Sequence, residues 1–164
     1  MTIKLNIKES MVGKKTYKIV ETHYNSAVAI LNIKQDHMLL TNKFRTVVNT
    51  DSWEIPGGLI NKEGMSARNV AVGKIMETTG KEINAVDLEI TTHYFPIIGS
   101  IKHKVYIWKA VVKDMLSEVK NDEVIEAKWF TFDEIEDMVN TSGIVDGKTI
   151  TAFYKIAYEN LKKL

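Results

Sequence analysis

The chain has 164 residues, of which 45% are hydrophobic and 26% are charged, and its formal net charge is +1. These proportions are typical of a soluble globular protein, and the near-neutral charge gives no reason to expect a nucleic acid or an anionic membrane as partner. The chain has no cysteine, which excludes disulfides, thiol catalysis and zinc–thiolate sites.

No uninterrupted apolar run approaches the ~18 residues of a membrane span. The opening sequence MTIKLNIKES lacks the apolar core of a signal peptide. We therefore expect a cytoplasmic protein with a single domain over residues 1–164.

The first half of the chain is predicted to be rich in strands. Alternating or continuous apolar residues indicate strands at residues 3–8, 15–20, 26–33, 38–41 and 53–55. The run SAVAILNI at 26–33 is apolar throughout, which is typical of a buried strand rather than an edge strand. Pro56-Gly57-Gly58 should stop the last of these strands in a loop. Ser66 is expected to cap a helix over 67–79, and Gly80 should end it.

The second half repeats the mixed pattern. Strands are predicted at 88–94, 104–112 and 126–130, and helices at 132–139 and 146–164. The last helix is amphipathic, and its apolar face is predicted to contain Ile150, Phe153, Ile156, Ala157 and Leu161. Because strands outnumber helices and alternate with them, we expect a mixed α/β sandwich rather than a helical bundle.

One stretch, WEIPGGLINKEGMSARNVAVGKIMETTG at 53–80, reads as strand, glycine loop and helix. A glycine loop lets backbone approach a pyrophosphate. Residues 58–80 resemble the Nudix box. The pattern of that box begins with a glycine, five residues of any kind, a glutamate and seven residues of any kind. It continues with Arg-Glu, an apolar residue, any residue, Glu-Glu, any residue and a final glycine. Three carboxylates at i, i+3 and i+4 would lie on one helix face and hold Mg²⁺.

The resemblance extends beyond the box. SAVAIL, MLLTNKFR, NDEVIEAKWFTFDEIEDMV and GIVDGKTITAFYKI are similar, in this order, to segments of ADP-ribose pyrophosphatases. The resemblance implies a Nudix-type α/β/α sandwich with a mixed central sheet. It also implies a pocket for a nucleoside-diphosphate-linked small molecule and Mg²⁺-dependent pyrophosphohydrolysis. Homodimers with N-terminal strands that cross between subunits are implied as well, although the N-terminal region of this chain is short for such strands.

The box departs from the family pattern in its first part. It is one residue too long, and the extra residue is placed within 61–63. Met65 stands at the first glutamate position, although Glu63 is close enough to compete for it as a metal ligand. Gly73 stands where the family has an arginine that orients the acids.

The metal-binding face departs further. Lys74 and Thr78 replace two glutamates, and Glu77 is the one box carboxylate left in place. Lys74 would repel a metal ion, and a lone carboxylate binds Mg²⁺ weakly. Two alternatives stay open for this helix: Lys74 contacts a ligand phosphate directly, or Lys74 and Glu77 form an ordinary surface ion pair.

Other candidates come from the resemblance. Arg45 could contact a phosphate or be a surface arginine, and Glu54 could lie near the ligand or pair across the sheet. Gly57 and Gly58 are expected beside the pyrophosphate. Glu123, in an acidic loop, is the candidate for a residual catalytic base beside Glu77.

Two further features have alternative explanations. The segment PIIGSIKHK at 96–104 puts Lys102, His103 and Lys104 in a predicted loop where the family commonly has acids. These side chains could attract an anionic ligand or simply lie in solvent. Trp53 and Phe44 could stack on a base, and the core is the favoured place for both.

The sequence therefore predicts a protein like ADP-ribose pyrophosphatase that binds a nucleoside diphosphate derivative with weak or absent Mg²⁺ binding and hydrolysis. One alternative is an active hydrolase of ADP-ribose-like or nucleotide-sugar substrates that uses a relocated metal set of Glu63, Glu77 and Glu123. The other alternative is a protein-interaction domain without a small-molecule pocket.

Overall fold

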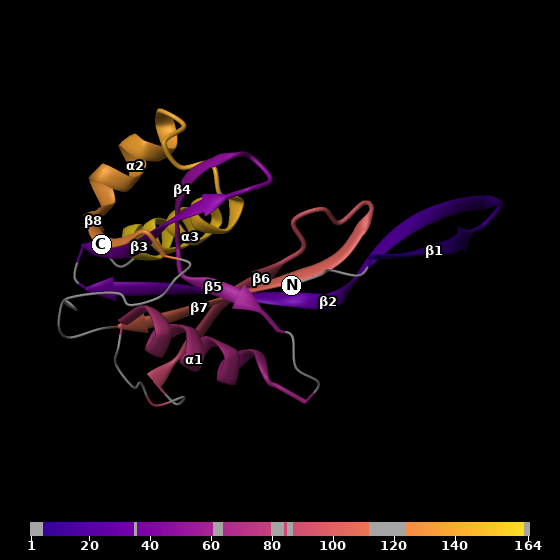
Figure 1. Cartoon of the computed structure of the whole chain (residues 1–164), viewed down its shortest axis with the longest axis horizontal. Helices are drawn as coiled ribbons and strands as arrows, with labels where there is room; N and C mark the ends of the chain where they lie inside the picture. The colour runs from indigo at the N-terminus through magenta and orange to yellow at the C-terminus, as the bar shows by residue number, and fades with distance from the viewer. Residues whose placement is uncertain are drawn as a thin grey trace.

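The computed structural model describes residues 5–34, 36–60, 64–79, 84, 87–111 and 124–162, and only the backbone of residues 22–34. Along the chain, β1 to β5 precede α1, and β6 to β8 precede α2 and α3 (Figure 1). The strands are β1 Leu5–Val12, β2 Lys15–Lys34, β3 His37–Arg45, β4 Thr50–Glu54, β5 Gly57–Leu59, β6 Glu89–Tyr94, β7 Ile101–Val111 and β8 Glu126–Thr131. The helices are α1 Ala67–Thr79, α2 Phe132–Asn140 and α3 Gly147–Leu161.

The strands form a mixed sheet in which β2 is central. The main path of hydrogen-bonded neighbours is β4-β3-β2-β7-β6, while β1 and β5 also pair with β2, and β8 pairs with β3. The long β2–β7 pairing is parallel, and the other pairings among the described residues are antiparallel. The expectation of a mixed central sheet is confirmed.

Two hydrophobic clusters lie on opposite faces of β7. Val105 and Ile107 belong to the cluster that α2 and α3 cover, whereas Trp108 and Ala110 belong to the cluster that α1 covers. Successive side chains of a strand point to opposite faces of the sheet. The architecture is therefore a sandwich with α1 on one face and α2 and α3 on the other (Figure 1).

The helices begin at the signals present in the sequence. Ser66 Oγ accepts a hydrogen bond from the Asn69 backbone N at 3.1 Å, and α1 occupies the predicted residues 67–79. Thr131 and Glu134 form a capping box at α2, and Asp146 caps α3. Gly80, the expected end of α1, lies outside the described residues.

Several local predictions are wrong. The strands expected at 15–20 and 26–33 are one strand, β2. Gly57 and Gly58 lie in β5, not in a loop, because they pair with Ala29 and Val28 of β2. Residues 101–104 likewise start β7 instead of belonging to a loop.

Phe44, for which the core was the favoured place, is exposed near the end of β3. Leu161, expected on the apolar face of the last helix, ends α3 and is also exposed. Trp53, by contrast, packs against the core, with its ring at 5.0 Å from that of Phe130. None of the described helices is long and apolar enough to span a membrane.

Candidate functional site

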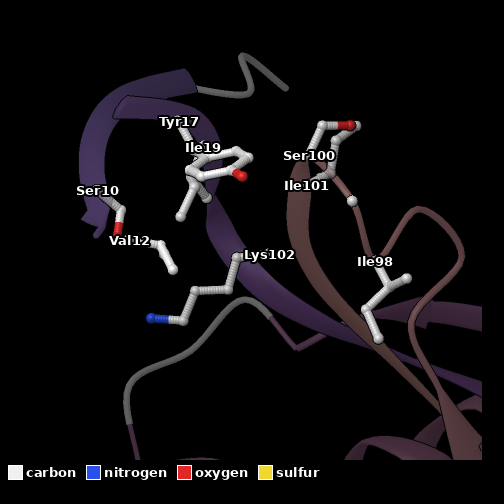
Figure 2. Close-up of a pocket in the computed structure, with 9 residues that line it drawn as sticks. Ser10, Val12, Tyr17, Ile19, Ile98, Ser100, Ile101 and Lys102 are labelled. Atoms are coloured by element: carbon white, nitrogen blue, oxygen red, sulfur yellow. The ribbon is translucent and has the colours of Figure 1, made fainter. Parts of the chain in front are cut away.

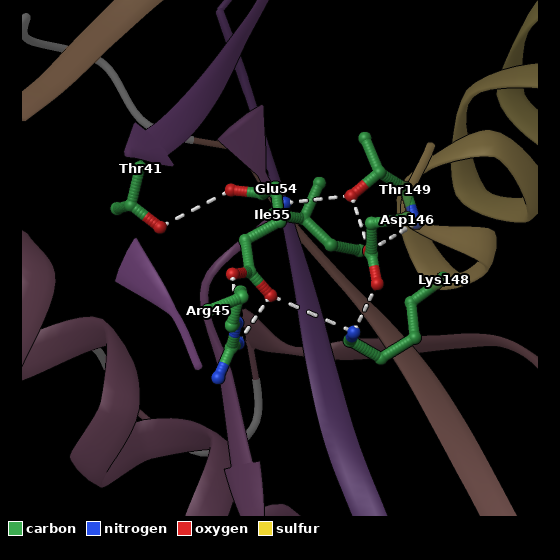
Figure 3. A network of polar contacts seen from close by, with 7 residues as sticks. All are labelled: Thr41, Arg45, Glu54, Ile55, Asp146, Lys148 and Thr149. Carbon is green, nitrogen blue, oxygen red and sulfur yellow. Dashed lines mark hydrogen bonds and ion pairs between the residues drawn. The ribbon is translucent and has the colours of Figure 1, made fainter. Parts of the chain in front are cut away.

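Arg45 and Glu54 form a pair with two side-chain hydrogen bonds (Figure 3). In the antiparallel pairing of β3 with β4, Arg45 lies opposite Thr50 and Glu54 lies opposite Thr41, so the long Arg45 side chain reaches along the strands to Glu54. Arg45 Nε donates to Glu54 Oε1 at 2.6 Å, and Nη2 donates to Oε2 at 2.5 Å. The Glu54 carboxylate is buried and holds the guanidinium by two charge-assisted hydrogen bonds. Glu54 was expected either to lie near a ligand or to pair across the sheet, and its contact with Arg45 is a pairing across the sheet.

A second cation and a second carboxylate complete this network. Lys148, at the start of α3, lies with its Nζ 3.6 Å from Glu54 Oε2 and also contacts Asp146 Oδ1. Burial acts to raise the pKa of Asp146, but the Lys148 ammonium and the hydrogen bonds from Lys148 and Thr149 outweigh it, so the pKa lies below its ordinary value. The network of Arg45, Glu54, Lys148 and Asp146 thus alternates positive and negative charge (Figure 3).

The same network fixes the backbone between β4 and β5. The backbone N of Ile55 donates to Thr149 Oγ1 at 2.9 Å, and this hydroxyl donates to Asp146 Oδ2 at 2.7 Å. On the other side, Thr41 Oγ1 donates to the Glu54 carbonyl at 3.1 Å. Because Gly57 begins β5 just after this segment, the N-terminal end of α3 anchors the chain that leads into the glycine strand.

The box helix α1 packs against β5 and β2. Within the helix, Lys74 Nζ contacts Glu77 Oε2, as expected for residues at i and i+3. Thr78 is buried, and its hydroxyl donates to the backbone carbonyl of Lys74 at 2.6 Å. Thr78 therefore serves the helix itself and is turned away from solvent.

The side chain of Lys74 lies against Gly58. A Cβ built on Gly58 would lie 2.5 Å from Cε of Lys74, 3.2 Å from Cδ and 3.4 Å from Cγ. The aliphatic chain of Lys74 therefore lies directly across the glycine. The absence of a side chain at residue 58 makes room for Lys74, which is a reason for this glycine that sequence reasoning missed.

The described part of α1 does not fit Mg²⁺. Magnesium prefers several anionic oxygens in octahedral geometry, whereas Glu77 is bonded to an ammonium and Thr78 donates to the backbone. No group of three or more His, Asp or Glu suited to a metal occurs among the residues that the structure describes. Glu63 and Glu123, expected as metal ligand and residual base, lie outside those residues.

A cavity of about 360 Å³ opens elsewhere, between the β1–β2 hairpin and the start of β7 (Figure 2). Tyr17, Ile19 and Ile98 line it together with Lys102, one of the three basic residues that could attract an anionic ligand, whereas the predicted residues of the box and of the β3–β4 pair do not line it. Lys102 Nζ lies 3.1 Å from Glu21, and Lys8 contacts the same carboxylate. The hydrogen bonds from Lys8 and Lys102 lower the pKa of Glu21. Lys102 is thus paired within the chain, on a surface separate from the box helix.

The family of this chain follows from its sequence match to a known domain. The family model described as the NUDIX domain matches residues 23–152, a span that includes β3, β4, β5, the box helix and the start of α3. The chain belongs to the Nudix family. No curated protein matches this Nudix chain by sequence.

A solved structure agrees with this classification. The crystal structure of an ADP compounds hydrolase matches with a TM-score of 0.71 and 15% sequence identity, covering 99% of this chain and 96% of that one. At such identity the likeness concerns the fold. It confirms the expected Nudix-type α/β/α sandwich over almost the whole chain.

Proposed function

We propose that this Nudix-family protein binds a nucleoside-diphosphate-linked ligand and has weak or no Mg²⁺-dependent pyrophosphohydrolase activity. The observation that carries the proposal is the contact between Lys74 and Glu77 on the helix face where the family pattern has three glutamates. A lysine bound to the one remaining carboxylate neutralises the charge that would attract a metal ion.

The energetic consequence is large. A metal ion contributes several kcal/mol to a hydrolytic transition state, and each ~1.4 kcal/mol changes the rate tenfold. Thr78 adds no ligand, because it is buried and hydrogen-bonded to the helix backbone. Hydrolysis should therefore be slower by orders of magnitude than with a complete set of carboxylates.

Features that favour ligand binding are retained. The network of Arg45, Glu54 and Lys148 fixes the chain entering β5, and such order lowers the entropic cost of binding. Lys74, whose aliphatic chain lies against Gly58, supplies an ammonium group near β5, which suits a diphosphate. The structural likeness to a protein named as an ADP compounds hydrolase supports the same ligand class.

A thermal-shift panel of ADP-ribose, NAD and free nucleotides tests the binding. A ligand at 100 times its dissociation constant stabilises the native state by about 2.7 kcal/mol, which for a chain of this size raises Tm by roughly 5–10 °C. No shift with any member of the panel would favour a protein-interaction domain instead.

The hydrolytic prediction needs a separate assay. Incubation of ADP-ribose with Mg²⁺ should release AMP slowly or not at all, and Glu77→Gln should change little. Release at an ordinary enzymatic rate that disappears in Glu77→Gln would contradict the proposal.

The relocated metal set of Glu63, Glu77 and Glu123 is the remaining enzymatic alternative. Calorimetric titration with Mn²⁺ or Mg²⁺ distinguishes it, since three carboxylates should give tight binding and the lone Glu77 should not. Loss of tight metal binding in Glu63→Gln or in Glu123→Gln would establish the alternative.

We also propose a homodimer as the assembly. The β1–β2 hairpin extends away from the rest of the sheet (Figure 1) and exposes Leu5, Ile7 and Met11 along one strand. Contiguous exposed apolar side chains mark interaction surfaces. Light scattering after size-exclusion chromatography should show a dimer that Ile7→Glu converts to monomer, and a monomeric wild type would contradict this. A cytoplasmic location stays a prediction.

A further inference from the structure

We infer that Lys74 replaces the metal ion as the cation that meets the ligand's phosphates, and that Glu77 holds Lys74 away from them until the ligand binds. The inference rests on the proposed function, because it describes how the same site accepts a diphosphate. It goes further in assigning opposite effects to two neighbouring residues of α1.

Lys74 lies where a phosphate beside Gly58 would meet it. Its Cγ, Cδ and Cε cover the side of Gly58 on which a Cβ would project. Since α1 packs on this side of β5, a phosphate that reaches the junction between α1 and Gly58 meets the lysine chain. The lysine must therefore either move aside or bond to the phosphate.

The ion pair between Lys74 and Glu77 is weak enough for a ligand to break. The side chains of Lys74 and Glu77 are 25% and 48% exposed, and ion pairs of this exposure are weak. A diphosphate carries more negative charge than one carboxylate, so it competes well for the ammonium. Lysine has a flexible stem and three rotatable donors, which allows its Nζ to leave Glu77 without moving the helix.

In this arrangement, Glu77 weakens the binding of the ligand. It competes for Lys74, and its negative charge repels phosphate. In an active Nudix site the corresponding carboxylate would instead help to bind the ligand through a metal ion. Removal of the Glu77 charge therefore has opposite expected effects in the two cases.

The experiment measures ADP-ribose binding by isothermal titration calorimetry in EDTA, with four proteins. These are wild type, Glu77→Gln, Lys74→Met and the double variant. Glu77→Gln should bind about two- to fivefold more tightly than wild type, as expected for loss of a partly exposed ion pair. Lys74→Met should bind at least about tenfold more weakly, because a charge-assisted hydrogen bond is lost. In the Lys74→Met background, Glu77→Gln should give a much smaller gain.

Glu159→Gln is the matched control, because Glu159 pairs with Lys155 on a helix of the opposite layer. It removes the same charge from a helical lysine–glutamate pair and should leave the affinity unchanged. Equal or weaker binding by Glu77→Gln overturns the inference, and so does a gain that persists in full without Lys74.

Failure of the proposed function gives a different result. If no variant binds ADP-ribose with or without Mg²⁺, the proposed function and the inference are both wrong. If wild type binds only when Mg²⁺ is added, the ligand class stands and the replacement of the metal by Lys74 is wrong.

Discussion

Arg45 and Glu54 should contribute unequally to stability, although they form one ion pair. The Glu54 side chain is 3% exposed, whereas that of Arg45 is 48% exposed. Removal of one partner of a buried pair is costly mainly because the other charge stays buried without compensation. Arg45→Met leaves the buried carboxylate, while Glu54→Gln leaves a cation that reaches water.

The structure sets the magnitudes. In Arg45→Met, Lys148 is the cation left to Glu54 among the residues that the structure describes, and its Nζ is 3.6 Å away and also contacts Asp146. We expect a loss of about 3 kcal/mol, the lower end of the range for breaking a buried pair. In Glu54→Gln, the amide oxygen still accepts one bond from Arg45, so the loss is about 1–1.5 kcal/mol.

Urea unfolding followed by circular dichroism measures the difference. A gap of about 2 kcal/mol separates the two midpoints by roughly 1 M urea at equal m. The double variant should be more stable than Arg45→Met alone, because it removes the stranded charge. Lys155→Met, which breaks the exposed pair with Glu159, should cost less than about 1 kcal/mol. A loss in Glu54→Gln equal to or larger than that in Arg45→Met would refute the reasoning.

Three other variants test single features. Gly73→Ala should stabilise the protein by about 1 kcal/mol, because a methyl group there meets no atom within 4 Å; an unchanged or lower Tm in calorimetry would count against this. Thr149→Val should cost about 1–3 kcal/mol in urea unfolding, because it removes the acceptor of the Ile55 N–H, while Thr149→Ser should keep most of the stability. Asp146→Ala should cost about 1 kcal/mol above about pH 5. Since the pKa of Asp146 is lower in the folded state, the unfolded state binds more protons on acidification, so the difference from wild type should shrink below about pH 4; a constant difference down to about pH 2 would contradict the assignment.

Local signals in the sequence were sufficient for the helices. Ser66 as the cap and Gly80 as the stop predicted a helix over 67–79, and α1 occupies Ala67–Thr79, because capping residues mark helix ends locally in the sequence. The glycines of β5 misled the prediction, since Gly57 and Gly58 are strand residues only by virtue of pairing with β2. The polar segment ETHYN at 21–25 similarly hid the continuity of β2, where the pairing with β7 shifts register.

The site was predictable only where the family pattern applied. The resemblance pointed to Arg45, Glu54, Lys74 and Glu77, and the structure shows that they form two ion pairs. It gave no indication of Lys148, which reaches Glu54 from far along the chain. No sequence spacing encodes that contact, because the folding of α3 against the sheet creates it.

Two of the three acid positions in the box helix can change without loss of the fold, because residues 74 and 77 are less buried than the residues that pack on the sheet. Val70, Ala71 and Ile75 are buried against the sheet, whereas Lys74 and Glu77 lie on the partly exposed side. Like charges at i, i+3 and i+4 destabilise a helix by a few tenths of a kcal/mol per pair, so a lysine among them relieves repulsion. Thr78 differs, because it is buried with its hydroxyl bonded to the backbone. A glutamate there would have to bury a carboxylate or shift the helix. Lys74→Glu can therefore restore one pair of carboxylates, and restoration of the third would work against the packing of this chain.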